Sequence, residues 1–358
     1  MQQATALNTS GCSMMTRLFI VGFGHVGQGF AHLLISRSQW LKTVEQLAFQ
    51  VIGITDLRYG TLVEPEGISL EQALQQIKQG IFFSTPPRPT EKLIRQLDYD
   101  ILIELTPTRL ETGEPAYGYI RAALDRRRHV ITTNKGPVAH HLLELQQLAQ
   151  KKGVFFRFEG TVMAGTPLIN LIHCHLAGAT IQKIEGIING TCNYILTRMA
   201  EGLDYPAALK EAQDKGYAEA DPTADVEGWD AVAKIMILSQ VIFGQKLPLH
   251  AIARQGISHL TVAEIYRAMK SGYHWRLIAT LERRNGTIAA SVAPREIPGD
   301  HPFASVTGAI NAVAIYTDCL TRITITGPGA GPLETGFAVL NDLIQIHRNM
   351  TQTPWQSS

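Results

Sequence analysis

The sequence predicts an α/β protein with two domains, and three observations carry this prediction. A buried strand at 17–21 runs directly into a glycine-rich turn, a region that mixes strands with long helices follows at about 155–310, and strand and helix patterns alternate through the first 150 residues. Alternation of this kind builds a mainly parallel sheet with helices on its faces. We therefore expect a Rossmann-type dinucleotide-binding domain, followed by a second α/β domain.

The length and the composition agree with two ordinary globular domains. The chain has 358 residues, of which 45% are hydrophobic and 18% charged, enough for two cores without disulfide support. A net charge of +1 gives no electrostatic attraction for nucleic acid or an anionic membrane. Four cysteines without paired spacing indicate reduced thiols, and no apolar run reaches the ~18 residues of a bilayer span. We expect a cytoplasmic protein that binds neither nucleic acid nor membrane.

The turn at 22–27 has the pattern Gly-Phe-Gly-His-Val-Gly between a strand and a helix. Gly22 allows the tight turn, Gly24 lets the backbone approach a pyrophosphate, and Gly27 allows the helix to pack closely. The helix N-terminus then faces the phosphates. Since both flanking elements have the required type, this turn predicts a nicotinamide dinucleotide site.

A second strand, at 49–55, ends where such folds meet the adenosine ribose. Asp56 favours a free 2′-hydroxyl and hence NAD, whereas Arg58 suits the 2′-phosphate of NADP. The two residues favour opposite cofactors, so the sequence leaves NAD and NADP both open.

Two further strands, at 101–105 and 129–133, are followed by Thr106 and by Asn134-Lys135. Ligands bind at the carboxyl ends of parallel strands, so both loops are candidates for the nicotinamide end of the cleft. A lysine there can donate a hydrogen bond to a substrate carbonyl or carboxylate. The alternative is that Lys135 is a solvated loop lysine.

The segment 212–234 combines a glycine turn at Gly216, an acidic loop broken by Pro222, and a helix expected from 225 to 243. Glu219 lies on the constrained loop. Asp230 and Lys234 are four residues apart and therefore neighbours on one side of that helix. Taken alone, the pair has a common alternative, an exposed ion pair worth about 0.3–0.5 kcal/mol.

A third glycine-rich loop follows the strand at 154–158 and leads into a helix expected at Pro167. Its carbonyl oxygens and the carboxylate of Glu159 suit a hard monovalent cation, while the alternative is an irregular hinge without an ion. Near the end of the chain, a strand at 321–326 leads into the glycine loop 327–332 and a last helix. We expect this return segment to rejoin the first domain, with Gly331 covering the nicotinamide end.

Several of these motifs resemble homoserine dehydrogenases. The resemblance rests on the irregular spacing in 212–234, on Asn134-Lys135 after a buried strand, and on Asn189-Gly190-Thr191-Cys192-Asn193, and it covers residues 17–348. It implies NAD(P)-dependent, reversible reduction of L-aspartate 4-semialdehyde to L-homoserine, in threonine, methionine and isoleucine biosynthesis.

The resemblance also implies residue roles. Lys234 is the implied proton donor to the aldehyde oxygen, Lys135 is cofactor-side support or a second proton carrier, and Glu219 and Asp230 meet the substrate. The implied cofactor-binding residues are Gly22, Phe23, Gly24, His25, Val26, Gly27, Asp56, Arg58, Thr106, Lys135, Gly216 and Gly331. A sodium-type ion is implied at Glu159, Val162, Ala164 and Thr166.

The expected domain limits follow from these assignments. We expect a flexible N-terminal extension at 1–15, a nucleotide-binding domain at 16–153, a catalytic and dimerisation domain at 154–310, a return segment at 311–348 and a loose tail at 349–358. The resemblance implies a homodimer or a dimer of dimers. The sequence stops about ten residues after the last expected helix, so we expect no effector-binding module of the ACT type.

Two other functions remain compatible with the sequence. One is a different Rossmann oxidoreductase that acts on a small amino aldehyde or hydroxy acid, and the other is a non-catalytic NAD(P)-sensing protein on the same scaffold. Reduction of NAD⁺ or NADP⁺ by homoserine distinguishes them.

Overall fold

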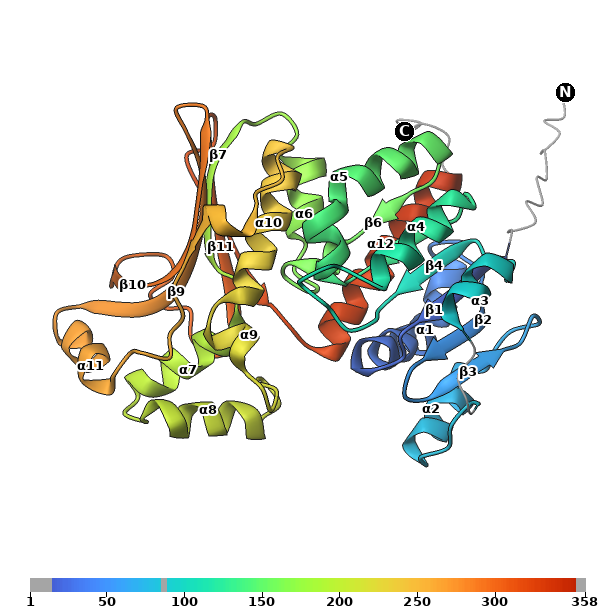
Figure 1. Cartoon of the computed structure of the whole chain (residues 1–358), viewed down its shortest axis with the longest axis horizontal. Coiled ribbons are helices and arrows are strands. Elements are labelled where there is room, and N and C mark those ends of the chain that lie inside the picture. The colour runs from blue at the N-terminus through green and yellow to red at the C-terminus, as the bar shows by residue number, and fades with distance from the viewer. Residues whose placement is uncertain (1–14, 85–88, 352–358) are drawn as a thin grey trace, which may run out of the picture.

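The computed structural model describes residues 15–84 and 89–351. Two six-stranded sheets organise these residues, each with its own helices (Figure 1). The predicted extension at 1–15 and the predicted tail at 349–358 lie mostly outside the described residues. The part of the tail that is described, residues 349–351, continues the last helix. The α/β class with a nucleotide-binding domain and a second domain is confirmed.

The first sheet has the strand order β3-β2-β1-β4-β5-β6. All neighbours are parallel except β2 and β3, which form an antiparallel edge. Its strands are β1 (Thr16–Val21), β2 (Phe49–Asp56), β3 (Gly60–Val63), β4 (Ile101–Glu104), β5 (His129–Thr132) and β6 (Phe156–Arg157). Its helices are α1 (His25–Thr43), α2 (Leu70–Lys78), α3 (Thr90–Gln96), α4 (Ala116–Asp125) and α5 (Lys135–Lys152). The strand order reverses at β1, since β2 and β3 lie on one side of it and β4 to β6 lie on the other. This reversal opens a crevice at the carboxyl ends of β1 and β4.

The second sheet has the order β12-β11-β7-β9-β10-β8 and is antiparallel except where β8 meets β10. Its strands are β7 (Ile181–Ile187), β8 (Ile252–Arg254), β9 (Tyr273–Arg284), β10 (Thr287–Pro298), β11 (Ile310–Thr317) and β12 (Ile323–Pro328). Helices α7 (Gly190–Ala200) and α10 (Trp229–Phe243) pack on its inner face. The other helices described here are α6 (Leu168–Asn170), η2 (Leu171–His175), α8 (Tyr205–Asp214), α9 (Thr223–Val226), η3 (Leu249–Ala251) and α11 (Val262–Lys270).

The helix predicted over 225–243 is two helices, because the chain bends at Gly228. Gly228 has φ +81°, a left-handed conformation that costs glycine little and ends α9 before α10 begins. Asp225 therefore lies on α9, while Asp230 and Lys234 lie on α10. The break changes the direction from which Asp225 approaches the other two side chains.

The two domains share one hydrophobic core cluster, which includes residues of both α5 and α10. Helix α10 packs directly on α5, and Gln240 on α10 donates to the carbonyl oxygens of Val138 and Ala139 on α5, at 3.3 and 2.8 Å. This contact fixes α10 close to the start of α5. It therefore places Lys234 on the same side as Lys135.

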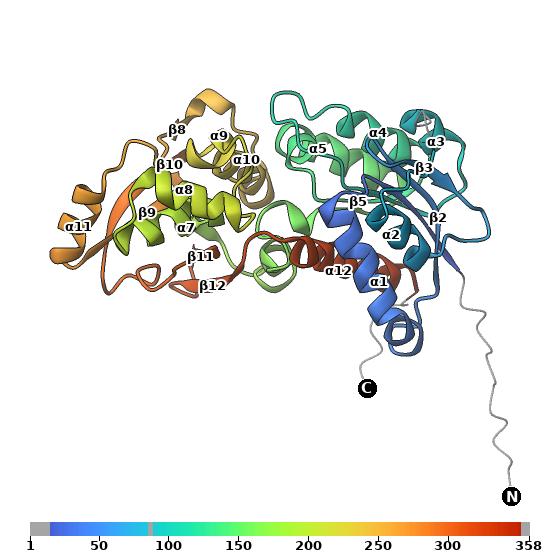
Figure 2. The same cartoon turned by 90° about the horizontal axis from the view of Figure 1, so that it is seen from below.

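The chain returns to the first domain later than predicted. The strand expected at 321–326 is β12, and it pairs with β11 in the second sheet instead of joining the first. The physical reason is that β11 offers it an antiparallel partner only six residues away. The return is made by α12 (Pro332–Thr351), which packs along α1 (Figure 2).

Candidate active site

The glycine-rich turn leaves space for a ligand at one position and none at the others. Gly22 has φ +95°, and a Cβ there would lie 2.5 Å from the carbonyl oxygen of Leu105. Around Gly24 nothing lies within 4 Å of such a Cβ. Helix α1 begins with the exposed His25, while the side chain of Phe23 is fully buried in the core. The turn thus has the open glycine and helix N-terminus that a pyrophosphate requires.

Asp56 lies at the end of β2 and is held by three backbone N–H groups. Its Oδ2 accepts from the N–H of Phe23 at 2.8 Å, and its Oδ1 accepts from Arg58 and Tyr59 at 2.7 and 3.1 Å. The guanidinium of Arg58 lies over the ring of Tyr59, 5.4 Å from its centroid. Asp56, Arg58 and Tyr59 line a cavity of about 340 Å³ that is partly open to solvent, together with Gly22, Gly24 and Thr106. The cavity joins the glycine-rich turn at residues 22–27, called the phosphate turn below, to Asp56 at the ribose position.

Lys135 and Lys234 come from different domains and meet at one carboxylate. Asp230 Oδ1 lies 3.2 Å from Lys135 Nζ, and Asp230 Oδ2 lies 2.8 Å from Lys234 Nζ. Lys234 also donates to the carbonyl oxygen of Ile188 at 2.6 Å. Its side chain is only 8% exposed, and that of Asp230 is 13% exposed. The pair is therefore not the exposed surface pair that its spacing alone also allowed.

The charges around Asp230 hold it ionised. Burial by itself raises the pKa of Asp230, but the ammonium groups of Lys234 and Lys135 outweigh burial and bring that pKa well below its usual range. The cleft thus contains two lysines bridged by one carboxylate. Such an arrangement can present an ammonium proton to an oxygen on which negative charge develops.

Two further residues at this point, Asn189 and Asp225, were not assigned roles from the sequence. Asn189 Nδ2 donates to Asp225 Oδ1 at 2.7 Å and to Asp230 Oδ2 at 3.0 Å, while its Oδ1 caps α7. Burial and then the charge of Asp230 raise the pKa of Asp225 to about 6. The Asn-Gly-Thr turn before a helix was the available signal for Asn189, because asparagine is a strong N-cap. Asp225 had no separate signal beside Glu219 and Asp221.

The other predicted substrate and cofactor residues lie further from this centre. Glu219 is exposed on the loop after α8, where its carbonyl oxygen accepts from Gln213 Nε2 at 3.1 Å. Gly216, with φ +73°, ends α8 and is also exposed. Gly331, with φ +134°, directly precedes α12. No contact among the described residues joins any of the three to Lys234.

The predicted cation residues lie in the segment that crosses between the domains, and Glu159 is a buried carboxyl within it. Glu159 begins the short helix η1 (Glu159–Thr161), and its oxygens accept from the N–H groups of Ile169 and Asn170 at 2.9 and 2.7 Å. Val162, Ala164 and Thr166 are also buried, and Ala164 has the left-handed φ of +46°. Burial raises the pKa of Glu159 to about 7. Within residues 15–84 and 89–351, no lysine, arginine or histidine forms an ion pair with Glu159.

Family models match both domains. The model described as "Homoserine dehydrogenase, NAD binding domain" matches residues 22–159, and the one described as "Homoserine dehydrogenase" matches residues 167–344. The chain belongs to the homoserine dehydrogenase family. A relative from Pseudomonas canavaninivorans, an "NAD(+)-dependent homoserine dehydrogenase", is 41% identical over 346 residues, which cover 94% of this chain and 97% of that one. The resemblance to homoserine dehydrogenases is thus confirmed.

Solved structures of the family share the fold. A putative homoserine dehydrogenase from Archaeoglobus fulgidus superposes with a TM-score of 0.84 at 38% identity, covering 93% of this chain and 99% of that one. A hyperthermophilic archaeal homoserine dehydrogenase in complex with NADPH gives a TM-score of 0.80 at 30% identity, covering 94% and 98%. The family assignment therefore extends over both domains. Within the described residues, no helix is long and apolar enough to cross a membrane.

Proposed function

We propose that this member of the homoserine dehydrogenase family uses Lys234 as the proton donor when L-aspartate 4-semialdehyde is reduced to L-homoserine. The observation that supports this role is the bridge from Lys135 through Asp230 to the buried Lys234. The nicotinamide, when bound, supplies the hydride to the aldehyde carbon. The oxygen then gains negative charge, and an ammonium proton at Lys234 Nζ meets it as the charge develops.

Lys135 and Asp230 have supporting roles in this proposal. The side chain of Lys135 is 27% exposed, so its ammonium group is available as a second cation for the substrate oxygen or carboxylate. Asp230 holds both ammonium groups in place, because each of its carboxylate oxygens lies within ion-pair distance of one of them. Glu219, on its loop, is the carboxylate proposed for the substrate ammonium. These assignments share one feature, which is that each charged group of the substrate meets an opposite charge.

We further propose NAD as the preferred cofactor. Gly22, Gly24 and the start of α1 fit a pyrophosphate, and Asp56 is fixed at the ribose position by three N–H groups. A carboxylate held there accepts from a free 2′-hydroxyl and repels a 2′-phosphate. Arg58, in contrast, has its guanidinium over Tyr59. The NAD⁺-dependent relative supports this preference, although another relative was solved with NADPH.

Initial-rate absorbance at 340 nm tests both proposals, with L-homoserine and either NAD⁺ or NADP⁺. We expect a kcat/KM at least tenfold higher with NAD⁺ than with NADP⁺, which corresponds to a free-energy difference of at least ~1.4 kcal/mol. Slower reduction of NADP⁺ is compatible with this expectation. If the protein is folded and binds the cofactor but reduces neither NAD⁺ nor NADP⁺, the catalytic proposal is contradicted and an NAD(P)-sensing role is favoured. A preference for NADP⁺ would contradict only the assignment of Asp56.

We propose a sodium-type cation at Glu159, Val162, Ala164 and Thr166. The residues fit such an ion because the buried Glu159 carboxyl forms no ion pair with a cation among the described residues and belongs to a glycine-rich loop whose carbonyl oxygens can serve as ligands. Thermal unfolding at pH 8 in sodium chloride and in choline chloride of equal ionic strength tests the site. A higher melting temperature in sodium is expected for the natural chain and not for Glu159→Gln. Equal temperatures in the two salts would exclude the ion.

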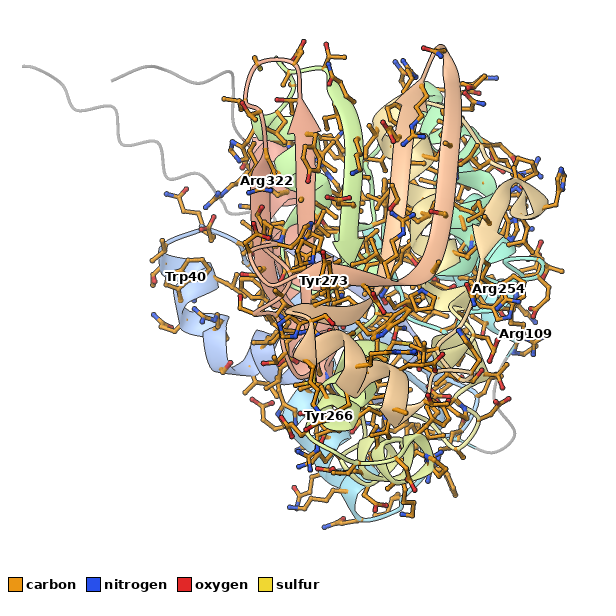
Figure 3. The ribbon with its side chains drawn as sticks, turned by 90° about the vertical axis from the view of Figure 1, so that its left-hand side faces the viewer. Trp40, Arg109, Arg254, Tyr266, Tyr273 and Arg322 are labelled. Carbon is orange, nitrogen blue, oxygen red and sulfur yellow. The ribbon has the colours of Figure 1, made fainter. Side chains whose placement is uncertain are left out.

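We also propose that the second sheet carries a homodimer interface. Figure 3 looks onto the outer face of this sheet, where the long strands β9 and β10 stand to the right of the labelled Tyr273 and Arg322. Thr280, on this side of β9, is 9% exposed and has a hydroxyl without a hydrogen-bond partner. Sedimentation equilibrium measures the state directly. A monomer at micromolar concentration would contradict the interface.

A further inference from the structure

We propose that Glu104, a buried acid at the end of β4, is a positioning residue that holds the two strand-end loops and Lys135 in their working geometry. Glu104 has no described contact with Asp230 or Lys234, so it acts through its neighbours and not on the substrate. The inference rests on the role proposed for Lys135. It adds a residue to the site that neither the glycine turn nor the lysine bridge contains.

The carboxyl of Glu104 is completely buried and receives three hydrogen bonds. Its Oε1 accepts from the backbone N–H of Thr106 at 2.9 Å and from the hydroxyl of the same residue. Its Oε2 accepts from the hydroxyl of Thr132 at 2.7 Å. Thr132 is the register partner of Glu104 in the parallel pair β4 and β5. One carboxyl thus joins the ends of both strands on which the nicotinamide side of the cleft is built.

A second layer of hydrogen bonds extends from this carboxyl to the start of α5. The hydroxyl oxygen of Thr132 accepts from the N–H of Asn134 at 3.0 Å. Asn134 Nδ2 returns to Thr106, at 3.1 Å from its carbonyl oxygen and 3.3 Å from its hydroxyl. Asn134 Oδ1 accepts from the N–H of Gly136 at 3.1 Å and so caps α5, whose first residue is Lys135. The backbone of Lys135 is therefore held on both sides by residues in this network.

The same network touches the phosphate turn. A Cβ at Gly22 would lie 2.5 Å from the carbonyl oxygen of Leu105 and 2.8 Å from the N–H nitrogen of Thr106. The turn therefore packs directly against the peptide group between Leu105 and Thr106. If that peptide moves, the turn and the nicotinamide end have to move with it, since packing this close transmits displacements.

The chemistry of the donors explains why an acid stands at this position. Three donors converge on two oxygens, and an apolar side chain would leave a buried N–H and two hydroxyl groups without acceptors. Burial raises the pKa of Glu104, whereas the hydrogen bonds from Thr106 and Thr132 lower it. Among the described residues, no lysine, arginine or histidine forms an ion pair with it. A glutamine keeps one acceptor for Thr106, and its N–H can donate to the hydroxyl oxygen of Thr132, so only the hydrogen of that hydroxyl loses its acceptor and most of the network is kept without the acid.

The test compares Glu104→Gln with Glu104→Ala in steady-state oxidation of L-homoserine. We expect Glu104→Ala to lower kcat by about 100-fold, because a displacement near 1 Å costs about that much. The dissociation constant of NAD⁺ is expected to rise, but by less than kcat falls, because the turn shifts while the ribose end at Asp56 keeps its own backbone contacts. Glu104→Gln is expected to restore kcat to within about threefold of the natural chain, which reflects the shared hydrogen-bond pattern.

Glu45→Ala is the matched control. Glu45 is an acid of the same domain whose side chain is 5% exposed and is paired with Arg348, far along the chain from the strand ends. Its loss is expected to lower thermal stability and leave kcat unchanged. If Glu104→Ala retains kcat within threefold, or if Glu104→Gln is as inactive as Glu104→Ala, the inference is wrong.

Two more variants keep the test decisive. Should Glu104→Ala fail to fold, Thr132→Val removes the hydroxyl between Glu104 and Asn134, and an unchanged kcat in that variant would overturn the inference. Lys135→Met separates this inference from the proposal on which it rests. If Lys135→Met keeps the natural rate, the role of Lys135 is wrong; if it loses the rate while Glu104→Ala does not, only the role of Glu104 is wrong.

Discussion

Replacing Lys234 with methionine removes the proposed proton donor while keeping the length of the side chain. General acid catalysis contributes typically 10²–10⁴-fold, which corresponds to about 2.7–5.4 kcal/mol of activation free energy. We therefore expect Lys234→Met to lower kcat for homoserine oxidation by at least about 10²-fold. Binding of the cofactor is expected to stay close to normal, because Lys234 lies across the cleft from the phosphate turn.

The structure also sets the expected effect of this change on stability. Lys234 is 6% exposed, donates to Ile188 at 2.6 Å and pairs with Asp230 at 2.8 Å. After the change, Asp230 keeps Lys135 at 3.2 Å and Asn189 at 3.0 Å, so its charge is not left alone. The carbonyl of Ile188 loses its donor. A loss of about 1–3 kcal/mol in the free energy of unfolding is expected for one such group.

The assay is initial-rate absorbance at 340 nm together with urea unfolding and a fluorescence titration of the cofactor. Lys210→Met is the matched control, because Lys210 also pairs with an aspartate four residues along a helix but is 68% exposed. That variant is expected to keep full activity. A Lys234→Met enzyme that retains kcat within tenfold, while folded and saturated with substrate, would remove Lys234 from the mechanism.

Three further predictions concern the cofactor site and the buried acids. Asp56→Ala is expected to lower the ratio of kcat/KM for NAD⁺ over NADP⁺ by at least about tenfold, because it removes the charge that opposes a 2′-phosphate; parallel initial rates measure the ratio, and an unchanged ratio would contradict the assignment. Gly24→Ala has no atom within 4 Å of its new Cβ, so it is expected to leave stability unchanged and to weaken cofactor binding. Gly29→Ala places its Cβ 2.2 Å from the carbonyl oxygen of Pro332, so it is expected to lower the free energy of unfolding in urea by about 1–3 kcal/mol. Burial raises the pKa of Asp342 from 3.8 to about 7. The contribution of the neutral carboxyl to stability is therefore complete below pH ~4 and is lost as the pH rises through 7. Asp342→Asn is expected to be about 2–3 kcal/mol more stable than the natural chain at pH 8 and to show a flatter pH dependence, and unfolding at pH 5.5 and 8 tests this.

Local patterns predicted those parts of the site that lie on one continuous segment. The glycine turn, its flanking strand and helix, and Asp56 at the end of the next strand all follow from residues within about 40 positions of one another. The spacing of Asp230 and Lys234 predicted one helical face. Each of these features depends on backbone geometry over a few residues, which the sequence specifies directly.

Partners that meet across the fold were not predictable in the same way. Glu104 and Thr132 are 28 residues apart, and Asn189 meets Asp225 and Asp230 from 36 and 41 residues away. Their hydrogen bonds exist because β4 lies beside β5 and because α7 and α10 share one face of a sheet. No local pattern distinguishes these acids and amides from others in similar segments.

Two errors in the predicted fold have the same origin. The helix over 225–243 reads as continuous from its apolar pattern, and the left-handed Gly228 divides it because the second half packs on α5 in a different direction. The strand near 321–326 reads as part of a return to the first domain, but antiparallel pairing with β11 retains it in the second sheet. In both cases, contacts with another element outweighed the preference of the segment itself.

The sequence by itself therefore determined the fold class, the dinucleotide turn and the identity of the main charged residues, because these depend on periodicity, glycine placement and spacing along the chain. Only the tertiary structure decided that Lys135 and Lys234 share Asp230, that Lys234 is buried, and that Glu104 connects two strand ends. The physical reason is that burial and charge pairing are properties of the space between elements. That space is defined by how α10 packs on α5 and how β4 pairs with β5, and not by any single segment.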